Sequence, residues 1–243
     1  MAKRKQSSCS CRPVHFDHFR LIGMVHLPAL PGAAGASQSM DRIIDRAVAE
    51  SALLAHAGFD AVIVENFGDT PFAAESVAPE TISAMSLVVD RVVRTVGIPV
   101  GVNVLRNDSL AALAIAATAG AVFIRVNVLS GVYATDQGFI TGRAAELIRR
   151  RKAIAPHVKI AADVHVKHAQ PVSQPDIARA AEETAYRAGA DALIVSGPAT
   201  GAETDVDALR RVARAVRDRP IWVGSGVSAT SVKTLLGIAE TPE

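Results

Sequence analysis

Three segments of the chain repeat one pattern, in which an Ala-Gly pair is followed by a short aliphatic run. They are AGFDAVIVEN at 57–66, AGAVFIRVN at 119–127 and AGADALIVSG at 188–197. Their glycines, Gly58, Gly120 and Gly189, suit the left-handed conformation just past a helix end, where a Cβ would be strained. Each segment therefore predicts a junction at which a helix ends and a β-strand begins.

The same alternation extends along most of the chain. Strands are predicted near 21–26, 60–65, 98–104, 121–127, 158–166, 191–196 and 220–224, with helical stretches at 40–57, 82–96, 109–119, 142–155, 176–188 and 206–218. Strict alternation at this spacing is typical of parallel βαβ units, either closed as a barrel or open and doubly wound. We favour an α/β fold of the (β/α)8 TIM-barrel type.

The alternation of side chains along the strands supports a barrel. In AVFIRVNV, the valines and Ile124 share one face, while Phe123, Arg125 and Asn127 share the other. In a barrel the inward face carries the active-site groups at the C-terminal ends of the strands. The inward polar set predicted in this way is His26, Glu65, Asn103, Arg125, Asn127, Asp163, His165, Lys167 and Ser196. Together they predict a catalytic mouth.

This set of side chains favours acid–base chemistry of the isomerase, epimerase or lyase kind, because it can abstract a proton next to a carbonyl and stabilise the enolate. The predicted catalytic residues are Glu65 or Asp163 as the base, with His165 or His26 as its partner. The predicted substrate-binding residues are Asn103, Arg125, Asn127, Lys167, Ser196 and Thr200. An inward ion pair that only fills the barrel is the structural alternative for Arg125.

A glycine-rich stretch after the seventh strand predicts a phosphate site. GSGV at 224–227 is expected to open a helix, and backbone N–H groups at such a position bind anions. We therefore expect Gly224, Ser225 and Gly226 to bind the phosphate of a small phosphorylated ligand.

No cofactor is predicted, although two additions stay open. His26, Glu65, Asp163 and His165 have the ligand chemistry of a divalent metal site. Lys167 could form a Schiff base if it were desolvated.

Composition limits the partners and the compartment. The 26 basic and 24 acidic residues are interspersed, giving a net charge of +2, which does not favour nucleic acid or an anionic membrane. The longest apolar runs are too short to form a transmembrane segment, so we expect a cytoplasmic protein. Both cysteines, Cys9 and Cys11, lie in a polar opening stretch. We therefore predict a disordered tail over 1–13 and a single barrel domain over 14–243.

Several longer motifs resemble the BtpA/SgcQ family of predicted TIM-barrel proteins. They are IGMVHLPALPG (22–32), DAVIVENFGDTPF (60–72), GVNVLRND (101–108), FIRVNVLSGVYATDQG (123–138), DVHVKHA (163–169), SGPATG (196–201) and VGSGVS (223–228). The resemblance implies a barrel with one of two roles. One is a phosphate-handling enzyme, and the other is a non-catalytic photosystem I biogenesis factor associated peripherally with the photosynthetic membrane.

The chain departs from that family at its end, where the eighth βα unit is expected to be missing or truncated. An incomplete barrel would leave unpaired edges on the first and seventh strands. Either the chain is truncated, a second copy covers the gap, or the segment VHFDHF at 14–19 fills it. We accordingly expect a homo-oligomer.

Overall fold

The seven predicted strands form one parallel sheet in the computed structural model, which describes residues 16–173, 176–197 and 204–240. They are β1 (Ile22–His26), β2 (Ala61–Glu65), β3 (Val100–Asn103), β4 (Phe123–Val126), β7 (Lys159–Val164), β9 (Ala192–Val195) and β10 (Ile221–Val223). Strands that follow one another along the chain are neighbours in the sheet, and each neighbouring pair is parallel. The fold is a partial (β/α) barrel, as predicted.

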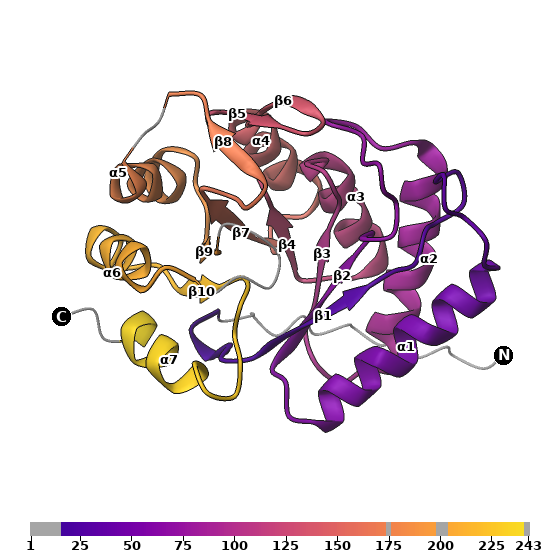
Figure 1. Cartoon of the computed structure of the whole chain (residues 1–243). Helices are drawn as coiled ribbons and strands as arrows, with labels where there is room; N and C mark the ends of the chain where they lie inside the picture. Colours follow the sequence, from indigo (N-terminus) through magenta and orange to yellow (C-terminus); the bar gives the residue numbers. More distant parts are fainter. Residues whose placement is uncertain (1–15, 174–175, 198–203, 241–243) are drawn as a thin grey trace, which may run out of the picture.

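Helices connect these strands and surround the sheet (Figure 1). They are α1 (Met40–His56), α2 (Pro79–Thr95), α3 (Ser109–Ala119), α4 (Ala144–Ile154), α5 (Ile177–Glu182), α6 (Val206–Ala215) and α7 (Val232–Glu240), with a π-helical turn (Glu183–Arg187) after α5. Several begin at a side-chain cap; Asp108, for example, accepts a hydrogen bond from the backbone N–H of Ala111. The predicted glycines also adopt the left-handed conformation, with φ of 88° at Gly58, 82° at Gly120 and 77° at Gly189.

The buried apolar side chains of the described residues form three clusters, the smallest of them around Tyr133 and Ile140. The largest cluster packs the outward aliphatic side chains of the strands, such as Val64 and Ile124, against the helices. A smaller inward layer contains Phe123 and Trp222 together with Phe16. Burial of these apolar side chains, worth about 25 cal/mol per Å², is the main force that holds the helices on the sheet.

The polar linkers carry structure that the sequence analysis missed. Three short strands form a separate antiparallel sheet in the order β6-β5-β8. They are β5 (Val132–Thr135), β6 (Gly138–Thr141) and β8 (Ala169–Pro171). Strands of three or four residues are too short to show a reliable alternation of apolar and polar side chains.

The predicted fifth strand of the barrel is also shorter than expected. The prediction placed it at 158–166, but β7 ends at Val164. His165 has a φ of 51°, a left-handed conformation that breaks the extended backbone. His165 and Lys167 therefore do not continue the strand face of Asp163, as the sequence analysis had assumed.

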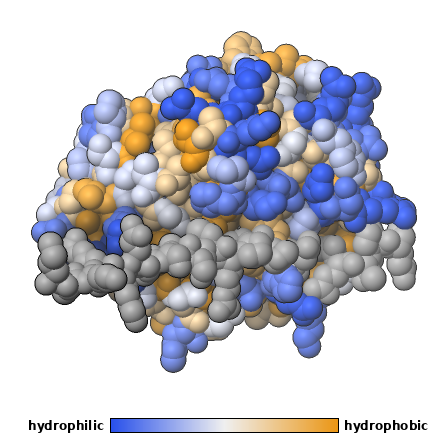
Figure 2. All heavy atoms as spheres, turned by 180° about the vertical axis from the view of Figure 1, so that it is seen from behind, coloured by the Kyte–Doolittle hydropathy of each residue, from blue (hydrophilic) through white to orange (hydrophobic). Residues whose placement is uncertain are grey.

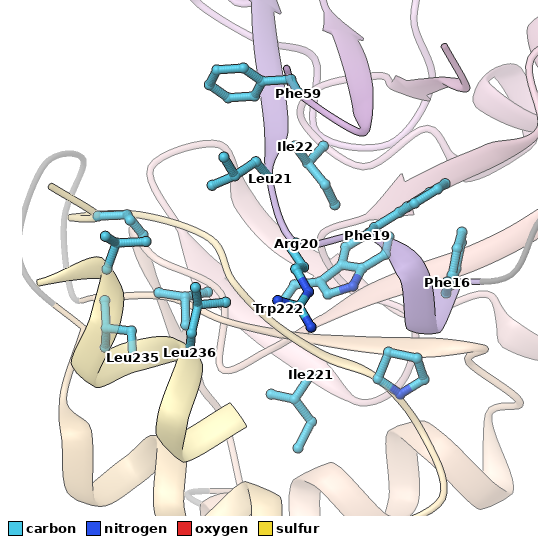
Figure 3. A pocket seen from close by; sticks show the side chains of 14 residues that line it. Phe16, Phe19, Arg20, Leu21, Ile22, Phe59, Ile221, Trp222, Leu235 and Leu236 are labelled. Atoms are coloured by element: carbon cyan, nitrogen blue, oxygen red, sulfur yellow. The ribbon is translucent and has the colours of Figure 1, made fainter. Parts of the chain in front are cut away.

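The barrel is open between β1 and β10, the two ends of the described sheet. A mostly apolar cavity of about 710 Å³ lies there, lined by residues that include Leu21, Ile22, Trp222 and Leu235 (Figure 3). The 3-10 helix Phe16–His18 does not pair as a strand. The ring of Phe16 instead packs 4.7 Å from that of Trp222. The described part of VHFDHF thus contributes to the inner core without closing the gap between the strands.

No helix in the described ranges is long and apolar enough to cross a membrane. On the face seen in Figure 2, hydrophilic and hydrophobic side chains are interspersed. The predicted tail at 1–13 lies outside the described residues and stays a prediction.

Candidate functional site

The inward polar residues meet at the C-terminal ends of neighbouring strands. The strand register pairs His26 with Glu65, Glu65 with Asn103, and Asn103 with Arg125. Glu65, Asn103, Arg125, Asn127 and Asp163 are all buried. Because buried polar side chains cost stability unless they are hydrogen-bonded, their partners determine what each can do.

Arg125 and Asp163 form the centre of this cluster. The guanidinium donates from Nε and Nη2 to the two carboxylate oxygens, at 3.0 and 2.9 Å. Asn127 Nδ2 donates to the same carboxylate at 3.0 Å. Burial alone lowers the pKa of Arg125, but the charge of Asp163 and its hydrogen bonds outweigh burial and raise the pKa above its ordinary value. The guanidinium of Arg125 is therefore held in its charged form.

A directional chain of amides extends from this ion pair. A carboxylate only accepts hydrogen bonds, so Asn127 must present its NH2 group to Asp163 and its oxygen to Asn103. Asn103 Nδ2 donates to that oxygen at 3.1 Å and to the Arg125 carbonyl at 3.2 Å. The oxygen of Asn103 is left buried without a partner. The chain thus ends in a free acceptor that a ligand hydroxyl could satisfy.

Glu65 is the less restrained of the two buried carboxylates. Its Oε1 lies 3.3 Å from His26 Nε2, and its Oε2 lies 4.0 Å from Arg125 Nη1. The His26 side chain is 44% exposed and stacks on the ring of Phe67, with the centroids 4.5 Å apart. Since Asp163 already accepts three hydrogen bonds, Glu65 is the better candidate for a base.

His165, Lys167 and Ser196 line a neighbouring cavity of about 530 Å³. The Nε2 of His165 and the hydroxyl of Ser196 are buried without partners. Burial lowers the pKa of His165, which favours the neutral imidazole. Burial, followed by the nearby charge of Arg125, likewise lowers the pKa of Lys167. No described contact joins His165 to Glu65 or Asp163. Of the two histidines predicted as the partner of the base, His26 is the one in contact with Glu65.

The glycine-rich stretch lies beside this cavity. A Cβ on Gly224 would come within 2.5 Å of the Ser196 hydroxyl, so only glycine fits there. Gly226 has a φ of 69°. The helix that follows begins at Val232, so the expectation that GSGV itself opens the helix was wrong. Phosphate binding by Gly224, Ser225 and Gly226 stays a prediction, and Thr200 lies outside the described residues.

The sequence analysis did not select one buried cation, Arg106, in the loop after β3. Its side chain is 6% exposed, and its Nη2 donates to the Lys167 carbonyl at 2.7 Å. The motif GVNVLRND could have indicated this residue, because it places an arginine directly after a barrel strand.

The four residues considered for a divalent metal do not assemble into a ligand set. Within the described residues, no three His, Cys, Asp or Glu side chains are placed to hold an ion together. Glu65 and His26 are adjacent, whereas Asp163 directs its oxygens to Arg125 and Asn127.

The fold and this polar mouth define the class: a TIM-barrel-type α/β protein with a buried charged network at the C-terminal ends of its strands. Comparison with known sequences gives the particular family. The chain belongs to the BtpA family, whose model matches residues 17–241.

Two relatives show how much of the chain is shared. It is 46% identical over 222 residues to the photosystem I biogenesis protein BtpA of Synechocystis, which covers 91% of this chain and 77% of that protein. It is also 46% identical over 220 residues to an uncharacterized protein of Pyrococcus horikoshii, covering 90% of this chain and 83% of the relative.

Solved structures support the fold alone, because their sequence identities are low. An N-acetylmannosamine-6-phosphate 2-epimerase from Clostridium perfringens matches with a TM-score of 0.56 at 13% identity, covering 90% of this chain and 82% of the epimerase. A putative phosphonomutase from Burkholderia cenocepacia matches with a TM-score of 0.54 at 19% identity, covering 79% of this chain and 80% of the other.

Proposed function

We propose that the protein is an enzyme that moves a proton next to a carbonyl group in a small phosphorylated substrate, as an isomerase, epimerase or lyase does. The observation that carries this proposal is the difference in environment between the two buried carboxylates. Asp163 is fixed by three hydrogen bonds, whereas within the described part of the chain the Glu65 carboxylate has ion-pair contacts with His26 and Arg125 alone. Two carboxylates in unlike environments are typical of sites that separate a positioning role from an acid–base role.

In this mechanism Glu65 takes the proton from the carbon beside the carbonyl. The electron pair of that C–H bond moves to the carbonyl oxygen and forms an enolate, which the nearby cation Arg125 stabilises. His26 accepts or returns the proton through its contact of 3.3 Å with Glu65. Asn103 accepts a hydrogen bond from a substrate hydroxyl, because its buried oxygen has no partner in the protein.

Two further observations support a phosphorylated substrate. The loop Gly224–Gly226 has a left-handed glycine and lies against Ser196, as expected for a backbone that closely approaches a ligand. Among the proteins of similar fold, one is an epimerase named for its 6-phosphate substrate.

A biogenesis role is the second candidate, because one relative with 46% identity is named a photosystem I biogenesis protein. A purely structural or assembly role leaves unexplained why the mouth keeps unpartnered polar atoms on Asn103, His165 and Ser196. We therefore rank the enzyme first.

The test is a thermal-shift screen of phosphorylated sugars and keto acids with the wild type, Glu65→Gln and Gly226→Ala. A ligand at about one hundred times its dissociation constant should stabilise the fold by about 2.7 kcal/mol. Glu65→Gln should keep the shift, because the base is not the main binding group, and Gly226→Ala should reduce it. Absence of any shift in a wild type that melts cooperatively would favour the assembly role.

A further inference from the structure

We propose that Arg106 and Lys167 form a second anion site in the mouth, which holds a carboxylate or phosphate group of the ligand. The proposal rests on the proposed function in one respect, since it takes the mouth to be a ligand site. It adds a substrate property: the ligand carries an anionic group on the β3–β7 side, apart from any phosphate at Gly224–Gly226.

The first step of the argument is that Arg106 is a buried cation without a counter-ion. Arg106 is 6% exposed, and its guanidinium makes no ion pair within the described residues, where Glu65 and Asp163 pair with Arg125 instead. Asp163, Asp136 and Glu65 act on it only at longer range, and burial lowers its pKa. A buried charge is costly unless it is paired, so the protein gains when an anion arrives.

The second step is that most of the donors of Arg106 are unused. A guanidinium has five N–H donors in a fixed planar fork that matches a carboxylate or phosphate. In the described structure one of these groups donates to a protein acceptor, the Lys167 carbonyl at 2.7 Å. The remaining edge of the fork is free to bind an oxyanion.

The third step is that Lys167, whose backbone carbonyl accepts the hydrogen bond of Arg106, adds a second cation nearby. The ammonium of Lys167 has no ion pair or hydrogen bond with a described carboxylate. Burial, followed by the charge of Arg125, lowers its pKa, and the longer-range charges of Glu65 and Asp163 do not offset this lowering. Like charges placed together without an anion repel each other. Lys167 also lines the cavity of about 530 Å³, so a ligand can reach it.

The fourth step is that the loop carrying Arg106 is fixed before a ligand binds. Asn66 Oδ1 accepts from the backbone N–H of Leu105 at 2.7 Å. On the other side of Arg106, the Asn107 side chain accepts from the Val128 N–H at 2.8 Å and donates to the Val128 carbonyl at 2.9 Å. Both neighbours of Arg106 are thus anchored to other strand ends. Such preorganisation is expected of a binding residue, because it lowers the entropy lost on binding.

The experiment titrates the full chain with inorganic phosphate and, separately, with malonate, and follows binding by calorimetry. The wild type should bind at least one of the two, and the preferred anion distinguishes a phosphate from a carboxylate site. Arg106→Gln and Lys167→Met should each weaken binding at least tenfold. The matched control is Arg94→Gln, which removes an exposed arginine paired with Asp90 on α2 and should bind like the wild type.

A second readout separates a binding role from a structural one. Without ligand, Arg106→Gln should melt at the same temperature as the wild type or higher, because it removes an unpaired buried charge. If Arg106→Gln fails to fold, Lys167→Met carries the test, since Lys167 is only partly buried.

The proposal is overturned if the wild type binds neither anion, or if both variants bind within threefold of the wild type. Its failure is distinct from that of the proposed function. If proton exchange depends on Glu65 but no anion binds through Arg106, only the proposal of the second anion site is wrong. If an anion binds through Arg106 but no proton exchange occurs, only the proposed enzymatic function is wrong.

Discussion

At the scale of single residues, the site depends on how one buried carboxylate is held. Asp163 accepts two hydrogen bonds from Arg125 and one from Asn127, and its side chain is fully buried. These contacts fix the guanidinium so that its third nitrogen, Nη1, faces Glu65 at 4.0 Å. Asp163 is therefore a positioning residue, and its loss should affect folding as well as activity.

Replacing Asp163 with asparagine should destabilise the protein strongly. The substitution leaves the buried Arg125 cation without its close counter-ion, a change that costs about 3–5 kcal/mol in other proteins. Urea unfolding of Asp163→Asn measures the loss. The matched control is Asp90→Asn, which breaks an exposed pair on α2 and should cost about 0.5 kcal/mol or less. Equal effects of the two substitutions would mean that the buried pair is not a stabilising contact.

His165 should make stability depend on pH. Burial lowers its pKa below the ordinary value of 6.5, so the unfolded chain binds its proton more readily than the folded chain does. Between the lowered pKa of the folded protein and the value of 6.5 in the unfolded chain, the free energy of unfolding should therefore rise as the pH rises and fall as the pH falls. His165→Gln should lose less stability than the wild type between about pH 7.5 and about pH 5. The exposed His157→Gln serves as a control and should follow the wild type.

The alternation of side chains predicted which residues share the mouth, but not what each one does. Glu65, Asn103, Arg125 and Asp163 were all placed correctly on the inward face. The strand sequence could not reveal that Asp163 accepts three hydrogen bonds and Glu65 fewer, because that depends on distances across the sheet. Arg106 was missed because it lies on a loop, where alternation gives no signal.

At the scale of elements, β3 and β4 pack through a glycine. A Cβ at Gly101 would meet the ring of Phe123 at 2.3 Å, so the ring lies directly over the glycine backbone. Phe123 is fully buried in the inner core layer. The absence of a side chain at Gly101 therefore sets the room for the largest inward group of β4.

Gly101→Ala should test this packing. The extra methyl group must displace the Phe123 ring, and overpacking of this kind typically costs about 1–3 kcal/mol. Gly97→Ala is the matched control, since a Cβ there has no neighbour within 4 Å, and it should change stability little. Thermal unfolding of both variants measures the difference in stability. If Gly101→Ala is as stable as Gly97→Ala, the inner layer has room that the structure does not show.

Element boundaries were predictable where the pattern was long. The seven barrel strands and the helices between them follow from the alternation and from the glycines at the helix ends. The antiparallel sheet of β5, β6 and β8 was not predictable, because its strands are only three or four residues long. The early end of β7 was also hidden, since nothing in DVHVKHA forces His165 into a left-handed conformation.

At the scale of the whole molecule, the barrel has a charged mouth at the strand ends and an open side between β1 and β10. The open side is mostly apolar, with a cavity of about 710 Å³ (Figure 3). The mouth instead gathers its polar groups from β1, β2, β3, β4 and β7, which are successive neighbours in the sheet (Figure 1). The proposed base, Glu65, lies on β2, which is paired on both sides, whereas its partner His26 lies on β1, at the edge of the open side.

The central claim is that Glu65 abstracts a proton from a carbon next to a carbonyl. The most direct measurement incubates the protein in D2O with a panel of phosphorylated aldoses, ketoses and keto acids and detects deuterium uptake by mass spectrometry. We predict that at least one compound gains a deuterium with the wild type and none does with Glu65→Gln. Uptake that is the same with both proteins, or no uptake by any compound with a folded wild type, would contradict the claim.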